Sequence, residues 1–179
     1  RKIHPAKCLN TNNWEAVRKD INLRPVEGVD GNCTDQEILD KLAKFGITPQ
    51  AVTLWGTGKP LREFLWSEEM ADASVHVLLN VDFKDTYAEG TKEVRNCHIN
   101  VGTGKELSIR EVAEKIMKEI DFKGKLQWDS SKPDGTMRKL TDVSKLHALG
   151  WHHKVEIDEG IHRLYEWYLK GICINHQTT

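Results

Sequence analysis

The sequence lacks several features that would by themselves narrow its function. No apolar run in its 179 residues approaches the roughly 20 residues that a membrane-spanning helix needs. Neither sign of charge dominates, because 26 Lys and Arg stand against 27 Asp and Glu, for a net charge of −1. A chain so balanced has no global attraction to nucleic acid or to a membrane surface. We therefore expect neither of these among its partners.

Cysteine is scarce and scattered, and no Cys-x-x-Cys pair occurs. The four cysteines are Cys8, Cys33, Cys97 and Cys173. This spacing argues against a zinc ribbon. With 39% hydrophobic and 30% charged residues the composition is that of an ordinary soluble domain, so we expect reduced thiols. The late histidines (His147, His152, His153, His162) lack the spacing of a metal site, and we predict surface and capping roles for them.

The stretch Val52–Trp66 is the most informative one in the chain. Its pattern predicts a strand up to Trp55, a tight turn at Gly56-Thr-Gly58, and a second extended run from Arg62. We expect Ser67 to cap a helix that runs to about Asn80. The turn would hold an aromatic ring and a guanidinium on its two sides, and a guanidinium can grip a phosphate with two donors.

Other elements follow from capping and periodicity. Capping boxes at Thr34–Glu37 and Ser108–Glu111 predict helix starts. Further helices are predicted at residues 1–9, 13–21, 143–149 and 158–170. Strands are predicted at Cys97–Val101 and Lys125–Trp128, and polar loops at residues 82–96 and 130–140.

Two glycine turns resemble nucleotide-binding motifs, but both are incomplete. Gly102-Thr-Gly104 follows a predicted strand, yet a dinucleotide fingerprint needs a third glycine where Leu107 stands. Gly56-Thr-Gly58 lacks the Lys-Ser/Thr ending of a P-loop. We interpret both as structural turns.

The loop Lys132-Pro-Asp-Gly-Thr-Met-Arg-Lys139 carries three cations around a Pro-Gly turn. Alone, it could be a solvated loop. Together with Trp55 and Arg62 it could form a basic pocket with an aromatic wall, which suits a nucleoside diphosphate.

Five stretches together resemble one enzyme family. They are Trp55-Gly-Thr-Gly-Lys-Pro-Leu-Arg-Glu-Phe-Leu65, Ser67-Glu-Glu-Met-Ala-Asp-Ala-Ser74, His98-Ile-Asn-Val-Gly-Thr-Gly104, Ser131-Lys-Pro-Asp-Gly-Thr-Met-Arg-Lys-Leu140 and Lys145-Leu-His-Ala-Leu-Gly-Trp151. They are similar to the C-terminal part of the GDP-L-fucose synthase family, which belongs to the extended short-chain dehydrogenases/reductases. These enzymes convert GDP-4-keto-6-deoxy-D-mannose to GDP-L-fucose by 3,5-epimerisation and NADPH-dependent 4-reduction.

The resemblance implies roles for particular residues. Trp55, Arg62 and Lys139 fall on positions that contact the GDP-sugar, and Lys2 on a basic substrate-binding position. Asp134 and Arg138 lie in the same substrate-facing loop. The resemblance also implies a homodimeric, cytoplasmic whole enzyme.

The resemblance covers about residues 51–170 and the first four residues, whereas residues 10–50 do not match the shorter family members. We expect residues 1–9 to end a helix from an upstream part, residues 10–50 to be a helical insertion, residues 51–171 to form the substrate-binding domain, and residues 172–179 to be a flexible tail. The fold would be a small mixed-sheet α/β domain without the Rossmann domain. The family's NADP-binding turn and catalytic residues lie upstream of the matching part, so we expect the chain alone to be inactive and NADP to be bound elsewhere.

Two alternatives remain open. One is the substrate domain of another nucleotide-sugar epimerase or dehydratase. The other is a non-catalytic interaction module with residues 10–50 as its partner surface.

Overall fold

The computed structural model describes the backbone of residues 2–174 and the side chains of residues 2–171. Its helices are α1 (Ile3–Asn10), α2 (Trp14–Leu23), α3 (Asp35–Lys44), α4 (Ser67–Asn80), the 3-10 helix η1 (Phe83–Thr86), α5 (Ile109–Ile120), α6 (Ser144–Ala148) and α7 (Ile157–Ile174). Its strands are β1 (Ala51–Trp55), β2 (Leu61–Glu63), β3 (Glu106–Ser108) and β4 (Lys125–Asp129).

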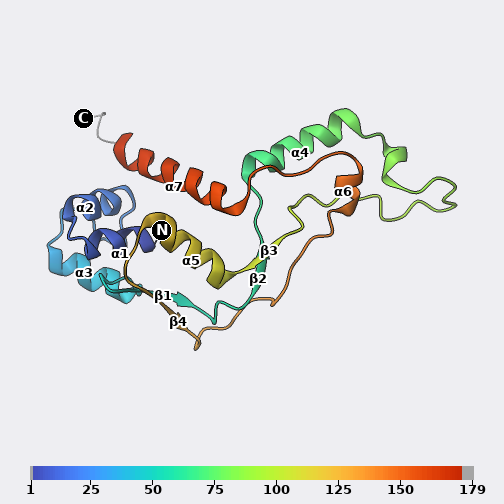
Figure 1. Cartoon of the computed structure of the whole chain (residues 1–179). Coiled ribbons are helices and arrows are strands. Elements are labelled where there is room, and N and C mark those ends of the chain that lie inside the picture. The colour runs from blue at the N-terminus through green and yellow to red at the C-terminus, as the bar shows by residue number, and fades with distance from the viewer. Residues whose placement is uncertain (1, 175–179) are drawn as a thin grey trace.

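The molecule has a large lobe and a small lobe (Figure 1). In the large lobe the first three helices, β1, β4, α5 and α7 surround one hydrophobic core, to which buried Val17, Ile38, Val52 and Phe122 contribute. In the small lobe α4 and α6 enclose a second core of Ala73, Leu146 and Trp151. The short β2–β3 ladder lies where the two lobes meet (Figure 1).

Helix starts follow from local side-chain capping. Both predicted capping boxes form, at Thr34–Glu37 for α3 and at Ser108–Glu111 for α5. In each box the hydroxyl and the carboxylate satisfy backbone N–H groups that a helix start leaves without partners. The helix predicted from Ser67 to Asn80 is confirmed, but its N-cap is Trp66 and no side chain caps it. The cap assigned to Ser67 is therefore wrong.

Strand pairing is mixed, as predicted, but it is divided between two separate ladders. β1 pairs with β4 in parallel, with Trp55 opposite Asp129. β2 pairs with β3 antiparallel, with Arg62 opposite Leu107 and Glu63 opposite Glu106. The two strands that flank the Gly56–Gly58 turn therefore belong to different sheets.

The strand predicted at Cys97–Val101 does not form. Within residues 2–174 no segment pairs with it. Instead Ile99 and Val101 pack against the core of the small lobe. The ammonium group of Lys145 binds the carbonyls of His98 and Asn96. A strand needs a neighbour to satisfy its backbone, so a strand-forming composition is not sufficient.

Residues 10–50 contribute to the core of the large lobe. Val17 and Ile21 of α2 and Ile38 and Leu42 of α3 are buried there. At the other end of the chain α7 extends to Ile174, four residues beyond the predicted helix. Residues 175–179 of the predicted tail, and Arg1, lie outside the described residues.

Truncation of Ile38 tests whether residues 10–50 are part of the folding unit. Ile38 is fully buried, so Ile38→Ala should lower the free energy of unfolding by roughly 2–5 kcal/mol. Lys44→Ala, at an exposed position of the same helix, should change it by less than about 0.5 kcal/mol. Urea denaturation measures both. Equal, small effects would show that this segment packs loosely on a core formed without it.

Candidate functional site

Trp55 ends β1 with its indole in solvent. Its exposed fraction is 73%. The Lys132 ammonium lies 5.7 Å from the ring centroid, on the ring face. The Gly56 N–H donates to the carbonyl of Asp129 at 3.0 Å, so the β1–β4 ladder fixes the backbone beside the ring. An exposed aromatic ring on a rigid strand end is a surface on which a flat ligand can stack.

Asp134 joins the loop after β4 to the turn after β1. Its carboxylate accepts the Thr57 N–H at 2.8 Å and the Thr57 hydroxyl at 2.6 Å. The hydroxyl and then the N–H of Thr57 lower the pKa of Asp134. Gly56, at φ +79°, leaves room for this carboxylate, because a Cβ there would collide with Asp134 Oδ1. Asp134 therefore positions the loop with its own carboxylate.

The same turn rests on Trp128. A Cβ on Gly58 (φ +76°) would lie 2.6 Å from the indole of Trp128, so only glycine permits this approach. The Arg110 guanidinium lies over the Trp128 ring, 4.7 Å from its centroid, and donates to the Thr57 carbonyl at 3.0 Å.

Arg62 fixes the middle of the loop against β2. Its Nη1 donates to the carbonyls of Leu61 and Thr136, each at 2.6 Å. The backbone N–H of Leu61 donates to the carbonyl of Met137 at 2.8 Å. Gly135 allows the close approach, since a Cβ there would lie 3.1 Å from Arg62 Nη2. The guanidinium is thereby oriented by backbone carbonyls.

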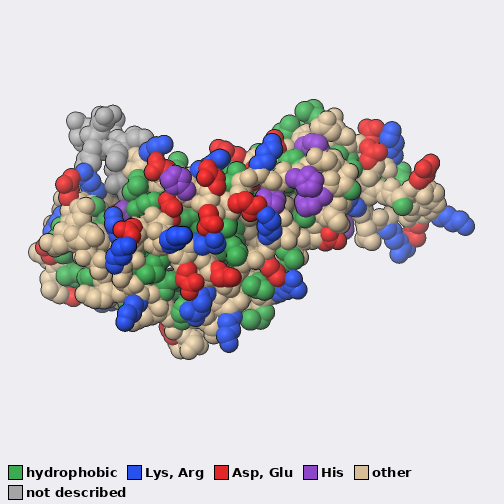
Figure 2. All heavy atoms as spheres, viewed as in Figure 1, with side chains coloured by type: hydrophobic (Ala, Val, Ile, Leu, Met, Phe, Trp, Pro, Cys, Tyr) green, Lys and Arg blue, Asp and Glu red, His purple; other side chains and the backbone are tan. Residues whose placement is uncertain are grey.

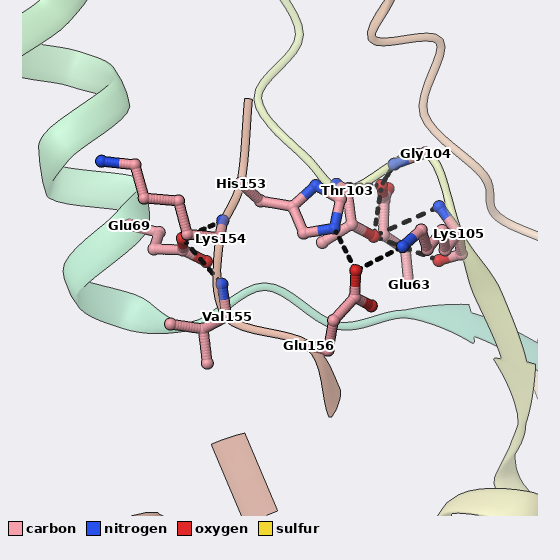
Figure 3. Close-up of polar contacts among 9 residues, drawn as sticks. All are labelled: Glu63, Glu69, Thr103, Gly104, Lys105, His153, Lys154, Val155 and Glu156. Carbon is pink, nitrogen blue, oxygen red and sulfur yellow. Dashed lines mark hydrogen bonds and ion pairs between the residues drawn. The ribbon is translucent and has the colours of Figure 1, made fainter. Parts of the chain in front are cut away.

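Glu63, the residue after Arg62, holds two further segments, and Figure 3 shows its contacts with the first of them, at Thr103 and Gly104. Its carboxylate accepts the N–H groups of Thr103 and Gly104, both at 2.6 Å, and that of Thr141 at 3.3 Å. Partial burial raises the pKa of Glu63, but the hydrogen bonds from Thr141, Gly104 and Thr103 outweigh it, so that the pKa lies below its ordinary value. No role was predicted for Glu63 from the sequence. An acidic residue within a predicted extended segment was the feature that could have indicated such a role.

Arg138 and Lys139 have different surroundings although they are neighbours. Arg138 Nε lies 2.8 Å from Oε1 of Glu106, and the hydrogen bond and charge of Glu106 raise the pKa of Arg138. Both residues line an open groove of about 750 Å³, together with Gly104, Thr141 and His147. Among the described residues, no side chain pairs with the Lys139 ammonium.

Lys2 lies apart from these residues. Its ammonium donates to the carbonyls of Phe45 at 2.8 Å and Thr53 at 3.2 Å. It lines a separate cavity of about 200 Å³ with Asp20 and Arg24, and partial burial lowers its pKa. The structure thus groups Trp55, Arg62, Asp134, Arg138 and Lys139 along one loop and places Lys2 at a second site.

A second polar network connects the small lobe to α7 (Figure 3). The buried carboxylate of Glu69 accepts the N–H groups of Lys154 and Val155, while Glu156 binds Lys105 and lies 3.4 Å from His153 Nε2. These contacts hold the chain entering α7. They leave the loop at Trp55 untouched.

The part of the chain that the structure describes contains no metal site and no disulfide bond. No group of three His, Cys, Asp or Glu side chains there could hold a metal ion. His147 stacks on His152 with centroids 4.2 Å apart. Cys8, Cys33 and Cys97 are free thiols.

None of the described helices is long and apolar enough to cross a membrane. Acidic and basic side chains are interspersed over the face shown in Figure 2.

The two glycine turns do not fit the pyrophosphate of a dinucleotide. Such a site needs backbone N–H groups that point at the ligand. Here the N–H groups of Thr103 and Gly104 donate to Glu63, and those of Gly56 and Thr57 donate to Asp129 and Asp134. Both turns use these donors within the protein.

Comparison with known proteins identifies the family. Residues 21–102 match the model of the NAD dependent epimerase/dehydratase family. The chain is 48% identical over 124 residues to GDP-L-fucose synthase 1 of Arabidopsis thaliana, which is 69% of this chain and 35% of that protein. It is 45% identical over 120 residues to GDP-L-fucose synthase of Escherichia coli K12, which is 67% of this chain and 36% of that protein.

Solved structures agree with this. DdhaC superposes with a TM-score of 0.81 at 40% identity over 97% of this chain and 46% of its own. A GDP-6-OMe-4-keto-L-xylo-heptose reductase of Campylobacter jejuni gives a TM-score of 0.81 at 39% identity over 95% of this chain and 46% of its own.

The chain is therefore a member of the NAD dependent epimerase/dehydratase family, the extended short-chain dehydrogenases/reductases. Within that family it is a homologue of the GDP-L-fucose synthases, and its solved neighbours include GDP-sugar reductases. It spans about a third of the length of the curated relatives it matches.

Substitution of Gly56 tests the contact between Asp134 and the turn. Gly56→Ala should destabilise the protein by more than the roughly 1–2 kcal/mol that a left-handed backbone costs a residue with a Cβ, because the methyl group also displaces Asp134. Gly28→Ala is the matched control, since Gly28 has φ +82° with nothing within 4 Å of a Cβ. Urea denaturation compares the two. Equal losses would contradict a role for the Asp134 contact.

The pKa of Glu63 predicts a dependence of stability on pH. Because this pKa is lowered in the folded chain, its stabilisation is present above the ordinary glutamate value of about 4.3 and disappears as the pH falls through the folded-state pKa. Glu63→Gln should therefore be less stable than the wild type at pH 7, and the difference should shrink near pH 3. Urea titrations at both pH values test this; an undiminished difference at pH 3 would refute it.

Proposed function

We propose that this chain holds the GDP-sugar in an enzyme of the GDP-L-fucose synthase type. The reaction would convert GDP-4-keto-6-deoxy-D-mannose to GDP-L-fucose by 3,5-epimerisation and NADPH-dependent 4-reduction. The observation that carries the proposal is the course of one loop. It passes the exposed ring of Trp55 at Lys132, then Arg62 at Thr136, and then presents Lys139.

This order suits an elongated ligand. Residues 132 to 139 span at most roughly 25 Å, which is the length scale of an extended nucleotide-diphosphate sugar. Trp55 would stack on the base, while Arg62 and Lys139 would meet the diphosphate, where charge-assisted hydrogen bonds are strongest. Binding energy from the GDP handle would then help to orient the sugar for reaction elsewhere in the enzyme.

Three other candidate residues have supporting roles in this proposal. Asp134 positions the loop through Thr57. Arg138 has its charge compensated by Glu106. Lys2 binds the Thr53 carbonyl, two residues before Trp55, so we propose that it supports the base end of the site.

We propose that the catalytic residues and the NADP site lie outside these 179 residues, and that the chain alone is inactive. Support comes from the two glycine turns, whose N–H donors are used internally. Residues 51–171 would then be the substrate-binding part and residues 10–50 a helical addition to its core. A homodimeric whole enzyme and a cytoplasmic location stay predictions.

A second candidate is a GDP-heptose 4-reductase. The superposition on DdhaC and on the heptose reductase spans 97% and 95% of this chain, and therefore most of residues 10–50. The curated synthases match about two thirds of it. In this alternative the same loop would hold GDP, and only the sugar would differ.

Calorimetric titration of GDP-L-fucose into the chain tests the proposal, with UDP-glucose as the control nucleotide sugar. We expect saturable binding of the GDP-sugar. Arg62→Ala and Lys139→Ala should each weaken it roughly 10- to 100-fold, because each removes a charged hydrogen bond worth about 1.5–3 kcal/mol.

Binding of UDP-glucose with equal affinity, or variants that bind like the wild type, would contradict the assignment. GDP-mannoheptose in a parallel titration separates the two candidates, since tighter binding of this ligand would favour the heptose reductase.

A further inference from the structure

Two carboxylates face each other across the β2–β3 ladder. Glu63 and Glu106 are direct partners in its register, so their side chains lie on the same face of a two-stranded sheet. Like charges directly opposite destabilise a strand pair. Each carboxylate therefore needs a compensating partner, and in this structure each finds one in the loop that carries Lys139.

Glu106 compensates its charge with Arg138. The guanidinium Nε lies 2.8 Å from Glu106 Oε1 and donates to Oε2 at 3.0 Å. The Glu106 side chain is 16% exposed and that of Arg138 is 65% exposed. This contact holds the loop at residue 138. It also pairs the positive charge of Arg138 with a carboxylate of the protein itself.

Glu63 holds the loop three residues further on. Its Oε2 accepts the Thr141 N–H at 3.3 Å, while Oε1 takes the N–H groups of Thr103 and Gly104 at 2.6 Å (Figure 3). Gly104 lines the same groove as Lys139. One carboxylate thus joins the wall of that groove to the segment that presents the lysine.

The attachments leave Lys139 between fixed points. On the β2 side the loop is held at Thr136 by Arg62 and at Met137 by the Leu61 N–H. Beyond Lys139 it is held at Thr141. Since residues 136–141 contain no helix or strand, these contacts hold the backbone on both sides of Lys139.

We propose that Glu63 is a positioning residue for substrate binding: through Thr141 and Gly104 it fixes Lys139 in the groove, where the lysine meets the diphosphate of a nucleotide sugar. Arg138 lines the same groove, and Glu106 has the complementary role of pairing the charge of Arg138 within the protein. This inference rests on the proposed function and assigns the binding cation within the Arg138-Lys139 pair.

A double-mutant cycle with GDP as the probe tests the inference. Glu63→Gln should weaken GDP binding about tenfold, because the lysine loses its alignment with the phosphates. Lys139→Ala should weaken it roughly 10- to 100-fold. The double variant should bind no more weakly than Lys139→Ala, because residues that act through one contact are not additive. A merely structural role of Glu63 would weaken binding in the Lys139→Ala background as well.

Two further variants sharpen the cycle. Glu106→Gln should tighten GDP binding, because it releases the charge of Arg138. Glu93→Gln, in the exposed loop near Arg95, changes the same functional group at a distance and should leave binding unaltered. Should Glu63→Gln fail to fold, Glu63→Asp replaces it, since a side chain one methylene shorter cannot reach both Gly104 and Thr141.

The outcomes distinguish the inference from the proposed function. If the wild-type chain binds GDP but the effects of Glu63→Gln and Lys139→Ala are additive, the positioning role is overturned and the proposed function stays intact. An equal loss in Glu106→Gln and Glu63→Gln would also overturn it. Absence of GDP binding by the wild-type chain would overturn both.

Discussion

The structure depends on one carboxylate at the junction of its two lobes. Glu63 accepts N–H groups from the turn at Thr103 and Gly104 and from Thr141, so it joins segments that are about 40 and 80 residues away in the chain. Neither segment belongs to a helix or a strand. The contact with Glu63 therefore holds them where regular secondary structure does not. A charged acceptor that binds several backbone donors is strong, and leaving any of its donors unsatisfied is costly.

The consequence is a candidate site made of an irregular loop on a rigid support. Asp134 holds the start of the loop at Thr57, Arg62 its middle at Thr136, and Glu63 its end. The loop itself carries Lys132 and Lys139. Supports of this kind lower the entropy that a ligand must remove on binding. They also separate two sorts of charged residue, those that build the site and those that remain available to a ligand.

Local features of the fold could be predicted from the sequence. The capping boxes at Thr34 and Ser108 involve residues three positions apart, and both form. Non-local features could not. The composition of Cys97–Val101 favours a strand, but no described residue pairs with it. Conversely, Glu106–Ser108 forms a strand with β2, although so short and polar a segment does not indicate one.

The candidate site shows the same division. The aromatic and basic residues at Trp55, Arg62 and Lys139 were evident from residue type and turn chemistry. Asp134 pairs with Thr57, and Arg138 pairs with Glu106. These contacts, like the separate cavity at Lys2, depend on packing between segments that are distant in the chain. Residue types therefore indicated which loop carries the basic side chains, but not which of its charges are already paired.

The most direct test of this account is a map of backbone amide chemical shifts in the labelled chain as GDP is added. The account predicts that the changes concentrate at Trp55, Arg62 and residues 136–141, and that the amides of Thr103 and Gly104 shift with them. Changes confined to the cavity lined by Lys2, Asp20 and Arg24 would contradict it, because the ligand would then bind away from the loop that Glu63 holds.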